Sequence, residues 1–193
     1  MSGSHKGSGF ERDLCRQLSS WWTGGTEDDL FWRTASSGGR ATIRHRKGKR
    51  TAGQYGDICA TDDRGAPLLQ WLTIEAKRGY SRVDILGVLD SNKAQHELCS
   101  FIEQAEREAR EAHVPFFLIV FKRDRGAPMV IAPWKLYCLV ASWHGWRACV
   151  GPGPLIRFRP SAEPTSYVVC RLDGWLAAVS PAFFKQTPYT TEG

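Results

Sequence analysis

The stretch that decides the fold is Thr73-Ile74-Glu75-Ala76-Lys77, which closes an apolar segment beginning near residue 68. Side chains alternate between the two faces of a β-strand, so Ile74 and Ala76 share one face while Glu75 and Lys77 share the other. The segment predicts a strand over residues 68–77 that presents a carboxylate and an amine together at its end. Alone, such a pair indicates only an ion pair on one face of a strand.

A second carboxylate, Asp57, opens the preceding apolar segment, which predicts a strand over residues 57–61. If the two strands pair, Asp57 lies beside Glu75. Two carboxylates and a backbone carbonyl, here that of Ala76, form an oxygen-rich site that suits Mg²⁺ or Mn²⁺. With a metal to polarise a phosphate and Lys77 to orient water or stabilise charge, this set predicts phosphodiester hydrolysis.

Glu11 lies in a helix that the spacing of apolar side chains predicts over residues 10–22, with Ser8 as its N-cap. Two interpretations of this carboxylate stay open. In a capping box, Glu11 would accept a hydrogen bond from the amide of Ser8. Alternatively, it faces the core side of the helix, one turn from Leu14, and needs a partner such as a metal site.

The remaining segments predict a mixed sheet flanked by helices. Strands are expected over residues 30–34, 115–121 and 129–132, with a long helix over residues 91–112 crossing between strands. The Trp- and Pro-rich segment 133–193 is expected to add a strand near residues 167–172 and a short helix near 175–184. The predicted organisation is an α/β core over residues 7–132 with a small C-terminal extension, residues 133–193, packed on it.

Composition and charge favour an intracellular protein with a polyanionic partner. The formal net charge is +6, and residues 33–56 contain many bases and no acid. The six cysteines form no CxxC pair, which disfavours zinc and favours a reducing cytoplasm. No apolar run is long enough to span a bilayer, and the polar start is no signal peptide.

Taken in order, these motifs resemble the PD-(D/E)xK nuclease superfamily, and within it the archaeal and phage Holliday junction resolvases. The similarity covers about residues 7–123. The matching segments are Gly7-Ser8-Gly9-Phe10-Glu11-Arg12, Arg33-Thr34-Ala35-Ser36-Ser37-Gly38, Gly56-Asp57-Ile58, Ile74-Glu75-Ala76-Lys77 and Phe117-Leu118-Ile119-Val120-Phe121-Lys122. Three features depart from the pattern: Gly56 replaces the commoner Pro, the loop 38–55 is longer and more basic, and residues 133–193 have no counterpart.

The resemblance implies a restriction-endonuclease-like fold and a homodimer that cuts branched DNA with Mg²⁺ or Mn²⁺. It also implies a bacterial or phage-encoded intracellular protein that is associated with the nucleoid when it binds DNA. Glu11 would be a further metal ligand, Ser36 or Ser37 would lie near the scissile phosphate, and Gln95 would be the family's helix glutamine. DNA contacts are expected from the loop and its flank, through Arg33, Ser37, Arg40, Arg44, Arg46, Lys47, Lys49 and Arg50.

Three other functions fit the same residues. A restriction-type enzyme would cut duplex DNA and would need base-reading elements, which the basic loop or residues 133–193 could supply. A non-catalytic DNA-binding module would have no reason to retain Asp57, Glu75 and Lys77 together. An RNA-processing enzyme of the same fold is the third.

Overall fold

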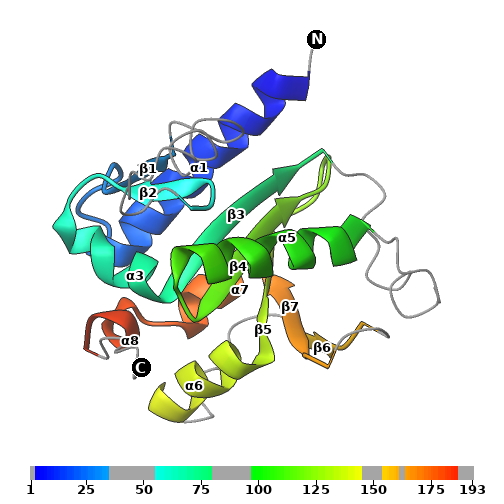
Figure 1. The fold of residues 1–193 in the computed structure, drawn as a ribbon. Helices are drawn as coiled ribbons and strands as arrows, with labels where there is room; N and C mark the ends of the chain where they lie inside the picture. Colours follow the sequence, from blue (N-terminus) through cyan, green and yellow to red (C-terminus); the bar gives the residue numbers. More distant parts are fainter. Residues whose placement is uncertain (1–2, 35–54, 80–96, 145–153, 161–163, 187–193) are drawn as a thin grey trace.

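The computed structural model describes residues 3–34, 55–79, 97–144, 154–160 and 164–186 (Figure 1). The helices and strands in chain order are α1 (Gly3–Thr23), β1 (Phe31–Arg33), β2 (Ile58–Ala60), the 3-10 turn η1 (Asp63–Gly65), α3 (Ala66–Trp71), β3 (Leu72–Arg78), α5 (Glu97–Ala112), β4 (Phe116–Lys122), β5 (Met129–Pro133), α6 (Trp134–His144), β6 (Ile156–Phe158), β7 (Tyr167–Arg171), α7 (Leu172–Ala178) and α8 (Pro181–Gln186).

The centre of the fold is a five-stranded mixed sheet with the order β3-β4-β5-β7-β6. β3 and β4 are parallel, and the connection between them contains α5. The pairs β4–β5, β5–β7 and β6–β7 are antiparallel. β1 and β2 pair with each other in a separate two-stranded sheet. The prediction of an α/β fold with a mixed, restriction-endonuclease-like sheet is confirmed.

Helices cover both faces of the sheet. On one face, α5 packs its apolar stripe against Phe117, Ile119 and Phe121 of β4. On the other face, α1, α3, α6, α7 and α8 enclose the alternate side chains of the sheet, including Leu118 and Val120. β4 is therefore apolar on both sides, as its uninterrupted apolar run predicts.

Three element boundaries differ from the prediction. The segment expected as one strand over residues 68–77 begins with the helix α3, which has Pro67 in its first turn, and the strand starts only at Leu72. Ser8 lies inside α1 and is not its N-cap, because that helix begins at Gly3. The single helix expected near residues 175–184 is two helices, α7 and α8, and Pro181 begins the second.

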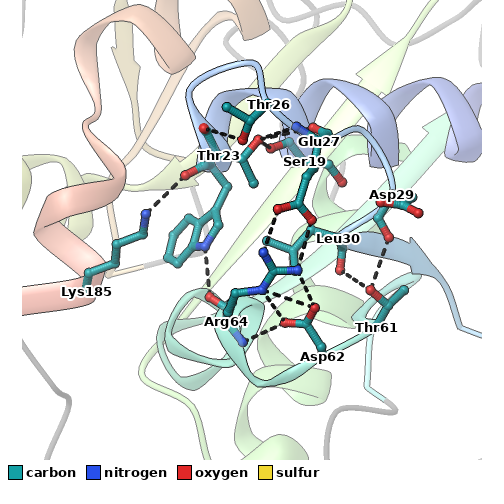
Figure 2. Close-up of polar contacts among 11 residues, drawn as sticks. Ser19, Thr23, Thr26, Glu27, Asp29, Leu30, Thr61, Asp62, Arg64 and Lys185 are labelled. Carbon is teal, nitrogen blue, oxygen red and sulfur yellow. Dashed lines mark hydrogen bonds and ion pairs between the residues drawn. The ribbon is translucent and has the colours of Figure 1, made fainter.

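The C-terminal part of the chain contributes to both the sheet and the core. β7 pairs with β5, so the central sheet runs across the predicted boundary near residue 132. Phe183 and Phe184 of α8 pack against Trp71 of α3, and Phe184 also contacts Trp22 of α1. Lys185 donates a hydrogen bond to the carbonyl of Trp22 and lies over its indole ring (Figure 2).

A buried hydroxyl fastens the end of α1 to the small sheet, and an exposed ion-pair cluster joins the loop after α1 to η1. Ser19 donates to the carbonyl of Cys15 and accepts from the amide of Phe31, both at 2.8 Å, and is fully buried. Arg64 bonds both Glu27 and Asp62 at the surface (Figure 2). Exposed ion pairs contribute little to stability, so the buried hydroxyl is the more important contact.

The substitution Ser19→Ala is expected to lower the free energy of unfolding by about 1–3 kcal/mol, because it leaves the buried amide of Phe31 without a partner. Ser142→Ala is the matched control, since Ser142 donates to a carbonyl four residues earlier in α6 but is exposed. We expect it to change stability by no more than about 0.5 kcal/mol. Urea denaturation measures both, and equal losses would contradict the assignment.

Candidate active site

Asp57 lies against the free edge of β3, at one end of the central sheet. Its amide donates to the carbonyl of Ile74 at 2.8 Å, and its Oδ2 accepts from the amide of Ala76 at 2.9 Å. The N–H and C=O of one strand residue point to the same side, so the carbonyl of Ala76 also faces this edge. Asp57 therefore lies beside β3 as expected, but not through strand pairing. β2 pairs with β1, and Asp57 contacts β3 through its own amide and carboxylate.

Gly56 makes this close approach feasible. Its φ is +75°, and a Cβ at this position would lie 2.8 Å from the oxygen of Ile74. Its amide donates to Oε2 of Glu108 at 3.1 Å, and its carbonyl accepts from the hydroxyl of Thr34 at 3.0 Å. A side chain at residue 56 would push the chain, and Asp57 with it, away from β3.

Glu75 and Lys77 point to the α5 side of the sheet, on the same face, as strand alternation predicts. Glu75 is only 2% exposed, and its Oε2 lies 2.8 Å from Nζ of Lys77. Nζ also donates to Oε1 of Gln104 at 3.0 Å and lies 5.7 Å from the ring centre of Phe101. The ammonium group is therefore held from β3 and from α5 together.

Two residues of α5 that were not predicted complete this cluster. Gln104 donates through Nε2 to Glu75 at 3.3 Å and to Oε1 of Glu108 at 2.8 Å. Glu108 in turn holds the amide of Gly56. One sequence signal exists, because residues 104 and 108 are a helical i, i+4 pair beside the apolar positions Ala105 and Ala109.

The carboxylates crowd one another. Burial is the main cause that raises the pKa of Glu75 to about 8, with further contributions from a hydrogen bond to Glu108 and the charge of Asp57, against the opposing charge of Lys77. Burial also raises the pKa of Asp57, although the amide of Ala76 and the charge of Lys77 oppose it. The pKa of Glu108 is lowered, despite burial, by hydrogen bonds from its neighbours.

Glu11 pairs with Arg33 of β1, at 2.7 Å between Oε2 and Nε. Both atoms are buried, and neither makes a well-directed hydrogen bond within the described residues. The charge of Glu11 also contributes to the raised pKa of Asp57, so it acts on this end of the site. The capping interpretation is wrong, because Ser8 is inside the helix and the partner of Glu11 is Arg33. Arg33, predicted to contact DNA, is engaged by Glu11 in this state.

A family model described as "phage putative PDDEXK endonuclease" matches residues 2–182. The chain belongs to this family. Membership confirms the resemblance to the PD-(D/E)xK nucleases and supports nuclease activity on DNA. The comparisons with curated proteins and with solved structures returned no match. In the part of the chain that the structure describes, no helix is long and apolar enough to cross a membrane.

The oxygen atoms at this site can be tested for their fit to the divalent cation that PD-(D/E)xK nucleases generally use. Within the described residues, no group of three or more His, Cys, Asp or Glu side chains is arranged to hold a metal ion. The predicted set has three carboxylates, those of Glu11, Asp57 and Glu75, besides the carbonyl of Ala76. In the structure Glu11 is paired with Arg33, which leaves the carboxylates of Asp57 and Glu75 and that carbonyl. Mg²⁺ commonly takes one or two carboxylates and keeps several waters. The buried, mutually repelling carboxylates fit such a cation, because its charge would offset their repulsion.

Several predicted residues lie outside the described residues. They are Ser36, Ser37, Arg40, Arg44, Arg46, Lys47, Lys49, Arg50 and Gln95. The glutamine that the structure brings to Lys77 is Gln104, and the predicted role of Gln95 stays a prediction.

The substitution Gly56→Ala is expected to destabilise the protein more than Gly24→Ala. Both glycines have positive φ, +75° and +67°, so each alanine adds a conformational cost of about 1–2 kcal/mol. Only the Cβ at residue 56 meets backbone atoms, which adds roughly 1–3 kcal/mol; Gly24 has no atom within 4 Å. Urea denaturation compares the two variants, and equal losses would show that the contact with Ile74 is not tight.

Proposed function

We propose that this protein is a Mg²⁺- or Mn²⁺-dependent endodeoxyribonuclease that hydrolyses phosphodiester bonds at the site formed by Asp57, Glu75 and Lys77. The observation that carries the proposal is the hydrogen bond from the amide of Ala76 to the carboxylate of Asp57. That bond joins the acidic residue of one motif to the middle of the Glu75-Ala76-Lys77 motif, so the two motifs form one site.

The metal would be held by the carboxylates of Asp57 and Glu75 and the carbonyl of Ala76, with Glu11 as a further ligand once it leaves Arg33. When bound, a divalent cation polarises the phosphate and lowers the pKa of a bound water. The protein's own part is to hold these oxygen atoms close together. Asp57 is fixed by two backbone contacts with β3, and Glu75 is fixed by Lys77 and Gln104.

Lys77 would act as a cation and hydrogen-bond donor. Burial lowers its pKa, but the charge of Glu75, its hydrogen bond to Glu75 and the charge of Asp57 raise it overall, so the amine stays protonated at neutral pH. A protonated amine cannot accept the proton of the attacking water. It can orient that water and offset the negative charge that develops on the phosphate. Gln104 accepts from Nζ and thereby positions it.

Selectivity for branched DNA and action as a homodimer belong to the proposal. They rest on the resemblance that the sequence motifs of residues 7–123 bear to the junction resolvases, which is a finer assignment than the family match gives. Contacts to the substrate are proposed for Ser36, Ser37 and the basic loop, and a second glutamine contact for Gln95. The restriction-type alternative would act on the same bond with the same residues, so substrate choice separates the two.

The decisive experiment incubates the full chain with labelled four-way junctions, flaps, duplexes and single strands of DNA, in Mg²⁺, Mn²⁺ or EDTA. We expect metal-dependent cleavage, strongest on the junction. Lys77→Met and Glu75→Gln should each lower the cleavage rate by about 100-fold or more, because each removes a charge at the reacting phosphate. Lys135→Met is the matched control, since Lys135 is exposed on α6, and should retain activity.

Each outcome has one interpretation. Cleavage of junctions with duplexes spared supports the resolvase-like proposal, and equal cleavage of duplexes supports a restriction-type enzyme. DNA binding without cleavage in any metal would overturn the enzyme and leave a binding module. Full activity of Lys77→Met, with unchanged thermal unfolding, would show that the chemistry lies elsewhere in the chain.

A further inference from the structure

One edge of the central sheet is lined with basic residues. β3 ends at Arg78 and β4 at Lys122, and these two residues are register partners. The turn after β4 adds Arg123 and Arg125, both exposed, and β7 ends at Arg171, which is the register partner of Met129 at the start of β5. We call these five residues the basic edge. Figure 1 shows the arrowheads of β3 and β4 side by side at this edge.

The opposite edge of the same sheet differs in character. The terminal residues of the strands there are Leu72, Phe116, Pro133, Phe158 and Tyr167, and none of them is charged. All five of these residues are buried, which accounts for their lack of charge. Two exposed bases, Lys135 and Arg159, follow β5 and β6 there. The basic edge differs because four of its bases, Arg78, Lys122, Arg123 and Arg125, lie together at the ends of two neighbouring strands and in the turn that follows, and such a cluster suits a polyanion.

The basic edge adjoins the candidate active site. Arg78 directly follows Lys77 in β3, and the amide of Gly79 donates to the carbonyl of Lys122 at 3.3 Å. From β3 to β7 the edge crosses three strand spacings of about 4.8 Å, or roughly 14 Å. That length equals about four base steps of B-form DNA at 3.4 Å each. A duplex with its scissile phosphate at Lys77 could thus run its backbone along this edge.

Acidic residues reduce the field without cancelling it. Asp124 lies in the turn between Arg123 and Arg125, and Asp173 bonds Arg171 at 2.6 Å. Arg123 and Arg125, both exposed, lie at the β4 end of the edge. Arg78 and Lys122 lie directly opposite each other in the parallel pair of β3 and β4.

We propose that the basic edge binds the phosphate backbone of a DNA duplex arm beside the scissile phosphate. The position relative to cleavage rests on the proposed nuclease function, whereas binding of the duplex does not require cleavage. The partner is DNA, because the chain belongs to an endonuclease family and the bases extend across several strands. We commit to a duplex arm because its stiff backbone holds successive phosphates in a regular row. Nothing in this contact reads sequence, so affinity should depend on salt and not on the bases.

The test compares two variants of equal net charge. The edge variant is Arg123→Gln with Arg125→Asn, where asparagine suits the positive φ of 60° at residue 125. The control is Lys135→Gln with Arg159→Gln, which removes two exposed bases that follow β5 and β6 at the opposite edge. Binding to a labelled duplex of about three helical turns is measured in EDTA, between 50 and 200 mM KCl, with thermal unfolding to verify folding.

Each phosphate contact contributes about 0.9 to the salt slope, so loss of two contacts lowers the slope by about 1.8. Across the fourfold salt range, wild type and control should lose about 12-fold more affinity than the edge variant. Equal slopes in all three proteins, equal weakening by the control, or no duplex binding by the wild type would overturn the proposal. Weaker binding of the edge variant to single strands with duplex affinity unchanged would also overturn it.

The same experiments distinguish failure of the nuclease proposal from failure of the DNA-binding proposal. If the wild type binds duplexes with the predicted slope but cleaves nothing in Mg²⁺ or Mn²⁺, the basic edge stands as a DNA-binding surface and the nuclease proposal falls. If the wild type cleaves DNA and the edge variant has the wild-type salt slope, the nuclease proposal stands and the proposal that the basic edge binds DNA is wrong.

Discussion

The contact between Asp57 and the free edge of β3 is the constraint on which the rest of the site depends. Asp57 occupies two hydrogen-bonding positions of that strand, one with its amide and one with its carboxylate. A further strand would pair with the same backbone groups of β3, so Asp57 blocks strand addition at this edge. It also places a carboxylate there, which the backbone of a strand would not. Gly56 allows this approach, and Glu108 holds the amide of Gly56 from α5. The site is therefore built where the sheet ends, from three separate parts of the chain.

Burial of this many acidic groups opposes folding unless they are paired. Glu75 is almost fully buried, and its neighbours include Asp57, Glu108 and one cation, Lys77. Hydrogen bonds from Gln104 and from the ammonium group of Lys77 relieve part of the repulsion. The apolar packing of α5 and of the tryptophan-rich helices on the other face supplies the stability that this arrangement lacks. Conflict between local stability and charge is a general property of functional sites, and here it is concentrated at the residues that the sequence analysis matched to the PD-(D/E)xK motif.

Local patterns were sufficient to predict the part of the site that lies on one strand. Alternation placed Glu75 and Lys77 on one face, and the apolar run in β4 predicted its cover on both sides. The helix α3 was missed because a short apolar segment such as Leu68-Leu69-Gln70-Trp71 fits a helix or a strand equally well. Gln104 and Glu108 were missed because the rotation of α5 against the sheet decides which of its polar residues reach Lys77. Arg33 is the partner of Glu11 only because the small sheet folds back on α1, which no local spacing encodes.

If Asp57 and Glu75 together hold a divalent cation, the protein should bind Mn²⁺ without DNA, and titration calorimetry measures this binding directly. Asp57→Asn preserves an oxygen that can accept from Ala76 but removes the charge. We predict saturable binding by the wild type, a matching rise in its melting temperature, and on the order of tenfold or weaker binding by Asp57→Asn. Equal Mn²⁺ affinity of the two proteins, or no binding by the wild type, would contradict the account.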